Sequence, residues 1–316
     1  MVTARSAVRR PVALSAFNRG RWCAFGDHLP HISSKTVTGV TNTIFMKKFL
    51  LIVCVAVMAQ FQAAAKPDIV IVKSPEKLHC DDTIAVFSPK GMKNKKNIKT
   101  VFLLHGWSDN WKKWSKMADM QKLADETGWR IINPDGFYAS WYFDNADPEK
   151  MQWRTSFWTE MWPELDRRYG LRPDRTFITG LSMGGHGAMN IFLDHPERFA
   201  GAGSMSGVLD LAATRDRFRV WEIVGKSSID EIPEYSAINR LEDFKKGPHS
   251  DGKLLVVTCG SEDREGLVNC ASAFGQKCDD LGLKYILMLS PGGHNWKYWP
   301  YIIYYHLGWF DEHMTE

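Results

Sequence analysis

The sequence lacks the patterns that would place it in several common classes of protein. None of the four cysteines beyond residue 65 belongs to a C-x-x-C pair or to a Cys/His spacing typical of a zinc site. No internal repeat, low-complexity tract or Pro/Gly-rich linker interrupts the chain from about residue 80 onward. These absences argue against a zinc protein and a repeat protein, and we expect neither a metal nor a cofactor.

An excess of positive charge is also missing from the main part of the chain. The whole sequence has 40 Lys and Arg against 36 Asp and Glu, a net charge of +4. Residues 1–65 contain eight of the bases and one of the acids, so the remainder has 32 bases, 35 acids and a net charge of −3. A domain that binds nucleic acid usually carries a basic patch, and we therefore expect no nucleic-acid partner.

The first 65 residues differ in composition from the rest. Residues 1–45 hold six Lys or Arg and one acid, without a clear apolar period. The stretch MKKFLLIVCVAVMAQFQAAAKPD follows from Met46, with a Lys pair, an apolar run from Phe49 to Met58, and three alanines that end at Ala65. A basic start, an apolar centre and small residues at the end are the three parts of a secretory signal peptide.

We therefore predict that residues 1–45 are a translated upstream extension and that residues 46–65 are a signal peptide, cleaved near Ala65. Residues 66–316 would then form one secreted or periplasmic domain. An uncleaved membrane anchor is the alternative, although the apolar run is shorter than the ~20 residues that a membrane span needs. We accordingly expect no stable membrane span in the mature chain, and the sequence leaves its oligomeric state open.

Short apolar runs alternate with longer amphipathic segments from about residue 80. The runs predict strands at 83–89, 99–107, 130–136, 175–180, 199–207, 253–260 and 284–290. Helical spacing of apolar residues covers 111–126, 157–169, 183–193, 267–281 and 299–313. Such alternation is typical of an α/β protein with a largely parallel sheet and helices on both faces. We predict a small, partly helical insertion between two strands at Leu211 to Arg240.

One serine stands between glycines in the stretch ITGLSMGGHGAMN, residues 178–190. Gly180 to Gly184 fit the G-x-S-x-G pattern of a sharp strand-to-helix turn, in which the serine hydroxyl projects from the apex. The glycines remove Cβ atoms that would clash in such a turn. Ligands bind beyond the carboxyl ends of the strands in a sheet of this kind, so we predict that Ser182 is a nucleophile rather than part of a plain turn.

A serine hydroxyl needs an adjacent base, and the base needs a third group that orients it. With this turn the chain order is serine, then acid, then histidine. His294 lies in the glycine-bearing loop SPGGHNWKYW just after a predicted strand, and we predict that it is the base. Asp263 in TCGSEDREG is the preferred acid, with Glu262 as second choice and Asp210 as an outside candidate. The alternative role for Asp263 is to cap the helix that follows it.

Acyl transfer also needs hydrogen-bond donors where negative charge develops on the carbonyl oxygen. The backbone N–H of Met183, just after the nucleophile, is one predicted donor, and that of Trp107 in FLLHGWSDNW is the other. His105 adjoins this turn and precedes the serine, so we predict a structural role for it. The same expectation holds for the remaining buried-helix and helix-end histidines, namely His186, His195, His306 and His313.

Export would permit disulfides, but the spacing of the cysteines does not favour one. Cys270 and Cys278 lie eight residues apart on a predicted helix, a rise of about 12 Å. A disulfide needs Cα atoms within roughly 7 Å of each other. We therefore expect free thiols in the core, those of Cys80, Cys259, Cys270 and Cys278.

These stretches together resemble a known family. LLHGWSDNW, SWYFDN, FWTEMWPELDRRYGLRPDRTFITGLSMGGHGAMNIFLDHPERFAGAGSMSG and GGHNWKYW are similar to segments of the secreted serine esterases with the α/β-hydrolase fold, over roughly residues 80–312. That family includes tributyrin-type, feruloyl and acetyl-xylan esterases, S-formylglutathione hydrolase and the mycolyltransferases. The resemblance implies the α/β-hydrolase fold, with a catalytic triad of Ser182, Asp263 and His294. It also implies an oxyanion hole formed by Trp107 and Met183.

By the same resemblance, SWYFDN occupies the loop near the acyl pocket, where Trp141 and Tyr142 would bind substrate. The alternative is that these two aromatic residues only close an edge of the core. The implied activity is that of a secreted serine carboxylic-ester hydrolase, acting on short-chain acyl or hydroxycinnamoyl esters of small molecules or carbohydrates such as plant polysaccharides. Acyl transfer of the mycolyltransferase type, S-formylglutathione hydrolysis and non-catalytic carbohydrate binding are the alternatives.

Overall fold

The computed structural model of the protein describes residues 66–214 and 217–315. They fall within one compact unit that spans Ala63–Glu316. The predicted upstream extension at 1–45 and the predicted signal peptide at 46–65 lie outside the described residues. Across the described ranges, no helix combines the length and the apolar composition needed to cross a membrane.

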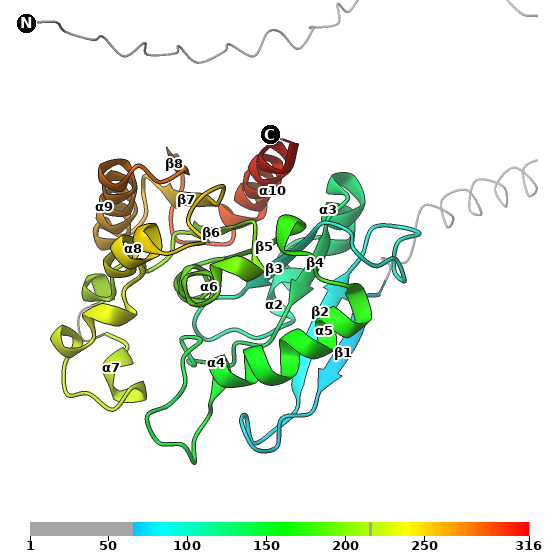
Figure 1. The fold of residues 1–316 in the computed structure, drawn as a ribbon, viewed down its shortest axis with the longest axis horizontal. Helices are drawn as coiled ribbons and strands as arrows, with labels where there is room; N and C mark the ends of the chain where they lie inside the picture. Colours follow the sequence, from blue (N-terminus) through cyan, green and yellow to red (C-terminus); the bar gives the residue numbers. More distant parts are fainter. Residues whose placement is uncertain (1–65, 215–216, 316) are drawn as a thin grey trace, which may run out of the picture. The chain divides into compact units, whose positions relative to one another are not determined.

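A mixed sheet forms the centre of the described part of the chain (Figure 1). Its eight strands lie in the order β1-β2-β4-β3-β5-β6-β7-β8. β2 runs antiparallel to both of its neighbours, β1 and β4, and the remaining pairs are parallel. The strands are β1 Asp68–Val72, β2 Asp82–Phe87, β3 Thr100–Leu104, β4 Arg130–Asn133, β5 Thr176–Gly180, β6 Gly201–Met205, β7 Leu254–Gly260 and β8 Tyr285–Ser290.

Helices cover both faces of the sheet (Figure 1). α3 and α10 pack with Val101 and Leu103 of β3 on one face, and α5, α6, α8 and α9 pack with Phe102 and Leu104 on the other. Successive side chains of a strand point to opposite faces, which explains why β3 is apolar throughout. The mostly parallel sheet between two helical layers confirms the predicted α/β-hydrolase fold class.

The α-helices are α2 Lys113–Met117, α3 Met120–Thr127, α4 Trp153–Ser156, α5 Trp162–Tyr169, α6 Met183–Asp194, α7 Val220–Ile223, α8 Ala237–Lys246, α9 Glu265–Leu281 and α10 Trp299–Thr315. A π-helical turn, η1 Phe157–Met161, joins α4 to α5. Short 3-10 turns are η2 Pro173–Arg175, η3 Pro196–Arg198, η4 Leu211–Thr214, η5 Ile229–Glu231 and η6 Pro233–Tyr235. In its described residues, the insertion predicted at Leu211 to Arg240 contains η4, α7, η5, η6 and the start of α8.

The predicted helix over 111–126 is broken into α2 and α3. Asp119 lies at the break, where its Oδ1 accepts a hydrogen bond from the N–H of Lys122 at 2.9 Å. An aspartate side chain competes for backbone N–H groups and stabilises helix starts. The break leaves Met117, the last residue of α2, 42% exposed.

Two other elements differ from the prediction. β1 was not expected, and its sequence DIVIV alternates between buried Val70 and Val72 and exposed Ile69 and Ile71 because it pairs at the edge of the sheet. The helix predicted from residue 157 begins earlier, with α4, and includes the π-helical turn. Pro163 has no N–H for the regular helical hydrogen bond, which accounts for the wider turn before α5.

The cysteines in the described residues are free. Cys259, Cys270 and Cys278 are buried, as expected for core thiols, and burial raises the pKa of each to about 12. Cys80 is exposed rather than buried in the core, because it lies in the connection before β2.

His306 of α10 ties that helix to the sheet. Its Nδ1 lies 3.0 Å from Thr179 Oγ1 of β5, and its Nε2 lies 3.0 Å from Thr258 Oγ1 of β7. The ring packs over Gly203 of β6, where an added Cβ would lie 2.5 Å from Nδ1. Burial lowers the pKa of His306 to about 3, so the ring is neutral, with each of its two nitrogens hydrogen-bonded to a threonine hydroxyl.

We predict that acid destabilises the fold partly through His306. An unfolded histidine titrates near pH 6.5 and this folded one near pH 3, so protons favour the unfolded chain between these values and stability is lost as the pH falls. One such group contributes about 1.4 kcal/mol per pH unit. In urea titrations between about pH 6 and pH 4, His306→Gln should show a shallower fall in unfolding free energy than the wild type. Parallel profiles would contradict this account.

Candidate active site

Ser182 occupies a strained turn between β5 and α6. Its φ is +52° and its ψ −118°, a region that costs a residue with a side chain about 1–3 kcal/mol. The Ser182 N–H donates to the carbonyl of Met205 at 2.9 Å, which anchors the turn to β6. A Cβ on Gly184 would lie 2.5 Å from the carbonyl oxygen of His105. The glycine thus allows the first turn of α6 to approach the loop after β3.

The structure brings Ser182, His294 and Asp263 together in one hydrogen-bonded chain. Ser182 Oγ lies 2.9 Å from His294 Nε2, and His294 Nδ1 lies 3.1 Å from the carboxylate of Asp263. The three residues follow β5, β8 and β7 respectively. Because these strands are parallel, their carboxyl ends lie at the same edge of the sheet, where such folds bind ligands.

The two alternative acids lie elsewhere. Glu262 is exposed, and its backbone, rather than its carboxylate, contacts the loop of His294 through the carbonyl of Gly292. Asp210 uses its carboxylate for the N–H of Ala212 and the hydroxyl of Ser236. Of the candidate acids, Asp263 is therefore the one that contacts His294.

The charge of Asp263 determines the tautomer of His294. Burial raises the pKa of this carboxyl, but interactions that include its hydrogen bonds with His294 and with the backbone N–H of Arg264 outweigh the effect and hold the pKa below its usual value. An ionised carboxylate only accepts hydrogen bonds, so His294 Nδ1 carries the proton and donates it. Nε2 is then free to accept the hydroxyl proton of Ser182.

The two predicted backbone donors lie at the wall of one cavity. Met183 is the first residue of α6, and Trp107 lies in the turn after β3. In the described part of the chain, neither N–H donates to another protein group. Both are therefore available to a ligand atom in the cavity.

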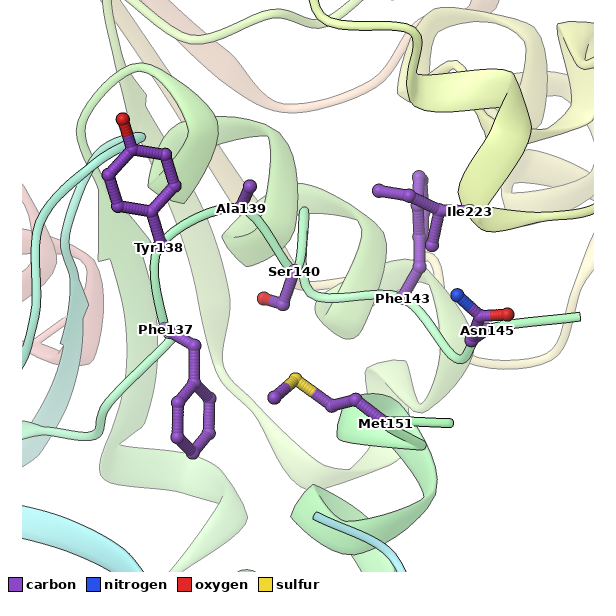
Figure 2. Close-up of a pocket in the computed structure, with 8 residues that line it drawn as sticks. All are labelled: Phe137, Tyr138, Ala139, Ser140, Phe143, Asn145, Met151 and Ile223. Atoms are coloured by element: carbon purple, nitrogen blue, oxygen red, sulfur yellow. The ribbon is translucent and has the colours of Figure 1, made fainter. Parts of the chain in front are cut away.

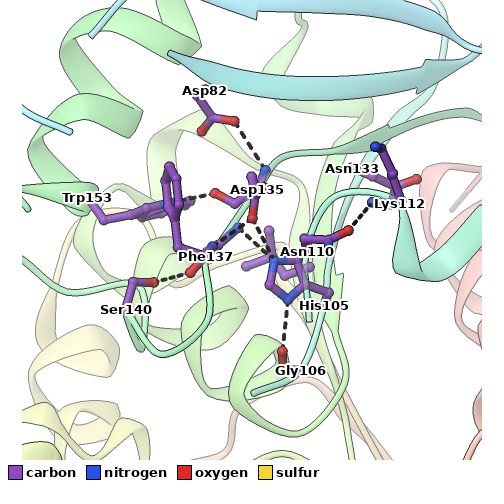
Figure 3. A network of polar contacts seen from close by, with 12 residues as sticks. Asp82, His105, Gly106, Asn110, Lys112, Asn133, Asp135, Phe137, Ser140 and Trp153 are labelled. Atoms are coloured by element: carbon purple, nitrogen blue, oxygen red, sulfur yellow. Dashed lines mark hydrogen bonds and ion pairs between the residues drawn. The ribbon is translucent and has the colours of Figure 1, made fainter. Parts of the chain in front are cut away.

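His105 holds this turn in place (Figure 3). Its Nε2 accepts a hydrogen bond from the N–H of Gly136 at 2.7 Å, so Nδ1 carries the proton and donates to the carbonyl of Gly106 at 2.8 Å. Asp135 lies 3.4 Å from Nε2, and the ring is buried. These contacts occupy both ring nitrogens and give His105 a structural position.

The cavity at Ser182 is small, about 80 Å³. Its wall includes residues predicted to form the site, namely Trp107, Trp141, Ser182 and Met183. Tyr142, predicted together with Trp141 to bind substrate, does not line it. Its side chain is fully buried, and the hydroxyl donates to the carbonyl of His105 at 2.8 Å. Tyr142 therefore supports the turn of Trp107 from within the core.

A second cavity, of about 280 Å³, lies in the same region of the chain (Figure 2). Figure 2 shows Phe137, Tyr138, Met151 and Ile223 around it. The ring of Tyr138 also contacts that of Trp107, with centroids 4.9 Å apart, which relates this cavity to the one at Ser182.

Three further histidines that were predicted to be structural contact other protein groups. His186 is fully buried in α6 and its Nδ1 contacts the carbonyl of Val208 at 3.0 Å; burial lowers its pKa to about 3. His195 Nδ1 lies 3.0 Å from Glu197 Oε1, and His313 Nε2 lies 2.9 Å from the carbonyl of Gly252. Among the described residues, no group of three or more His, Cys, Asp or Glu side chains could hold a metal ion.

Comparison with known proteins shows which family the chain is similar to. The family described as "Putative esterase" matches residues 75–304. An acetyl esterase of Caldicellulosiruptor saccharolyticus is 26% identical over 219 residues, 65% of this chain and 80% of that protein. The diacylglycerol acyltransferase/mycolyltransferase Ag85A of Mycobacterium tuberculosis (strain ATCC 25618 / H37Rv) is 28% identical over 123 residues, 36% of each chain. The match thus spans about a third of that relative.

Among solved structures, a ferulic acid esterase superposes with a TM-score of 0.66 at 23% identity, covering 79% of this chain and 99% of the other. This likeness and the sheet order define an α/β-hydrolase fold. Since the family match covers most of the sequence, the chain belongs to this family of esterases.

No motif points to three further residues of the cavity wall, Arg217, Phe218 and Arg264. The Phe218 ring contacts those of Trp107 and Trp141, with centroid distances of 5.3 and 5.4 Å. Arg217 and Phe218 come from the insertion, whose sequence shows neither a regular period nor a family motif. Their one signal is a cluster of bases, RDRFR, in a part of the chain with net negative charge.

We predict that Asp263→Asn lowers kcat for ester hydrolysis by about 10³–10⁴-fold, because an amide no longer selects the tautomer in which His294 Nε2 accepts a proton. Glu262→Gln, the adjacent control, should leave kcat within about threefold, as its side chain is exposed. Steady-state kinetics with a chromogenic acetate ester would measure both, and a larger loss in the Glu262 variant would reverse the assignment.

Proposed function

We propose that the protein is a serine carboxylic-ester hydrolase that works through an acyl-enzyme on short-chain acyl esters. The hydrogen-bonded chain from Ser182 through His294 to the buried carboxylate of Asp263 is the observation that carries the proposal. It supports nucleophilic catalysis, because a hydroxyl, its base and the group that orients the base are already in contact. The family match supports the same reaction class.

In the first step, Ser182 Oγ attacks the carbonyl carbon of the ester while His294 Nε2 takes the hydroxyl proton. The carboxylate of Asp263 stabilises the imidazolium that forms. The N–H groups of Met183 and Trp107 donate to the oxyanion of the tetrahedral intermediate, and each such donor is worth roughly 3 kcal/mol.

In the second step, the intermediate collapses and the bond to the alcohol oxygen breaks. His294 gives its proton to that oxygen, which leaves Ser182 acylated. Water then enters, loses a proton to His294 Nε2 and attacks the acyl carbon. Ser182 regains its proton as the carboxylic acid departs, so the enzyme returns to its starting state.

The size of the cavity favours a short acyl group. Its volume of about 80 Å³ is far below the roughly 300–1,000 Å³ typical of pockets that enclose larger ligands. Val208 and Leu267 give the wall apolar patches that suit a methyl or propyl group. An acetyl or butyryl ester fits this description better than a hydroxycinnamoyl ester, and the acetyl esterase relative points the same way.

We place this activity outside the cytoplasm, on the evidence of the signal-peptide pattern at residues 46–65. Amino-terminal sequencing of the exported protein would test this assignment. A new terminus at or next to Lys66 would support it, and an intact Met46 would contradict it.

Acyl transfer is the second candidate function, and the match to a mycolyltransferase favours it. It would use the same acyl-enzyme, with a sugar hydroxyl in place of water. Product analysis in the presence of a disaccharide separates the two functions. Transfer predicts an acylated sugar, whereas hydrolysis predicts free carboxylate irrespective of the sugar.

We predict that Ser182→Ala lowers kcat for 4-nitrophenyl acetate and butyrate by about 10⁴–10⁶-fold, since the nucleophile is lost. The variant should unfold at the wild-type temperature or above it, because alanine removes no buried hydrogen bond other than that to His294. Turnover equal to the wild type would rule out the mechanism.

We also predict that kcat/KM falls as the acyl chain lengthens from acetate through butyrate to octanoate. The small cavity cannot enclose the longer chain, so each further methylene would lie against solvent instead of gaining about 0.8 kcal/mol by burial. A series of 4-nitrophenyl esters measures this directly. A steady rise to octanoate would show that the acyl chain occupies another surface.

A further inference from the structure

Two arginines line the cavity at Ser182 and have no carboxylate partner. Arg217 belongs to the insertion that follows η4, and Arg264 lies between Asp263 and α9. Within the residues that the structure describes, neither guanidinium takes part in an ion pair. Arg219, two residues along the chain, pairs with Glu222 instead. Among the described residues, the two exposed positive charges at this cavity thus have no carboxylate that pairs with them.

These two charges lie close enough to affect each other. Burial and then the charge of Arg217 lower the pKa of Arg264, and Asp263 offsets only part of this shift. Arginine nevertheless stays protonated in proteins. The carboxylate of Asp263 cannot form ion pairs with both arginines, because it is buried and already hydrogen-bonded to His294. An anion between the two guanidiniums would relieve their repulsion.

The surroundings suit a carboxylate. A guanidinium presents a planar fork that binds a carboxylate through two parallel hydrogen bonds. Arg217 lies over the ring of Phe218, 5.1 Å from its centroid, which restricts the positions of its charged group. Both arginines are exposed, so an incoming carboxylate can reach their guanidinium groups, and Leu267 adds an apolar residue to the same wall.

We propose that Arg217 and Arg264 bind a carboxylate on the ester substrate, so that the protein prefers acidic esters to neutral esters of the same shape. The inference rests on the proposed function, because it places the ester bond at Ser182 and the carboxylate at the arginines. These residues determine specificity and take no part in proton transfer. The carboxylate belongs either to the acyl group, as in a monoester of a dicarboxylic acid, or to the alcohol, as in an acylated hydroxy acid.

Two matched pairs of substrates distinguish these sources in the purified protein. Monoethyl succinate and ethyl levulinate differ by a carboxylate against a methyl ketone on the acyl side. 4-Acetoxybenzoate and 4-acetoxyacetophenone differ in the same way on the alcohol side. We expect the wild type to favour the acidic member of one pair by roughly tenfold or more in kcat/KM, and the preferred pair identifies the source.

Arg217→Gln and Arg264→Gln should each reduce this preference about tenfold, since glutamine keeps the polarity and removes the charge. Arg219→Gln is the matched control, because it removes a neighbouring charge that is already paired, and it should leave the preference unchanged. The proposal is wrong if the wild type shows no preference in either pair, or if the preference survives in both glutamine variants.

Ligand binding to Ser182→Ala separates this proposal from the proposed function. Trp107 and Trp141 line the cavity, so tryptophan fluorescence reports binding without turnover. Tighter binding of the acidic ester, lost with Arg217→Gln or Arg264→Gln, upholds the arginine site even if the wild type hydrolyses no ester. The proposed arginine site is wrong, and the proposed function stands, if the wild type hydrolyses neutral esters and neither Arg217→Gln nor Arg264→Gln changes the affinity for the acidic ester.

Discussion

The strained backbone at Ser182 is the constraint on which the rest of the site depends. Holding this residue at a φ of +52° opposes its own preference, so the turn persists only because β5, β6 and α6 hold it on both sides. The hydrogen bond to Met205 and the close approach at Gly184 do this. The same turn aims the hydroxyl at His294 and leaves the N–H of Met183 without a helical partner.

Sheet order delivers the other groups to this turn. Because β5, β7 and β8 are parallel, the loops that carry Asp263 and His294 end at the edge where Ser182 stands. On the other side of the turn, the buried ring of His105 links the loop after β3 to the loop after β4 through the N–H of Gly136. The backbone thus sets the positions of the catalytic groups that we propose, while the insertion adds Arg217 and Phe218 to the cavity wall.

Much of this arrangement could be predicted from the sequence, because it rests on local signals. The spacing of apolar residues predicts the sheet and the helices that cover it. The glycines around Ser182 and His294 indicate the two loops that come together at the site. Signals of packing were missed. The spacing of apolar residues predicts one continuous helix here, and it does not reveal that Asp119 caps a new helix, α3, after α2 has ended. Trp141 and Tyr142 look alike in sequence and both are buried in the core, yet only Trp141 also lines the cavity at Ser182. Arg217 comes close to Arg264 because of the path taken by the irregular insertion. The spacing of apolar residues in the sequence does not predict that path.

The most direct test of the central claim is to trap the covalent intermediate and locate it. The protein would be mixed with 4-nitrophenyl acetate, quenched in acid within the first turnovers, digested and analysed by mass spectrometry. The account predicts an acetyl group on the Ser182 hydroxyl, formed more slowly when His294 is replaced by alanine. Turnover with no acetylated peptide, or with the acetyl group on another residue, would contradict it.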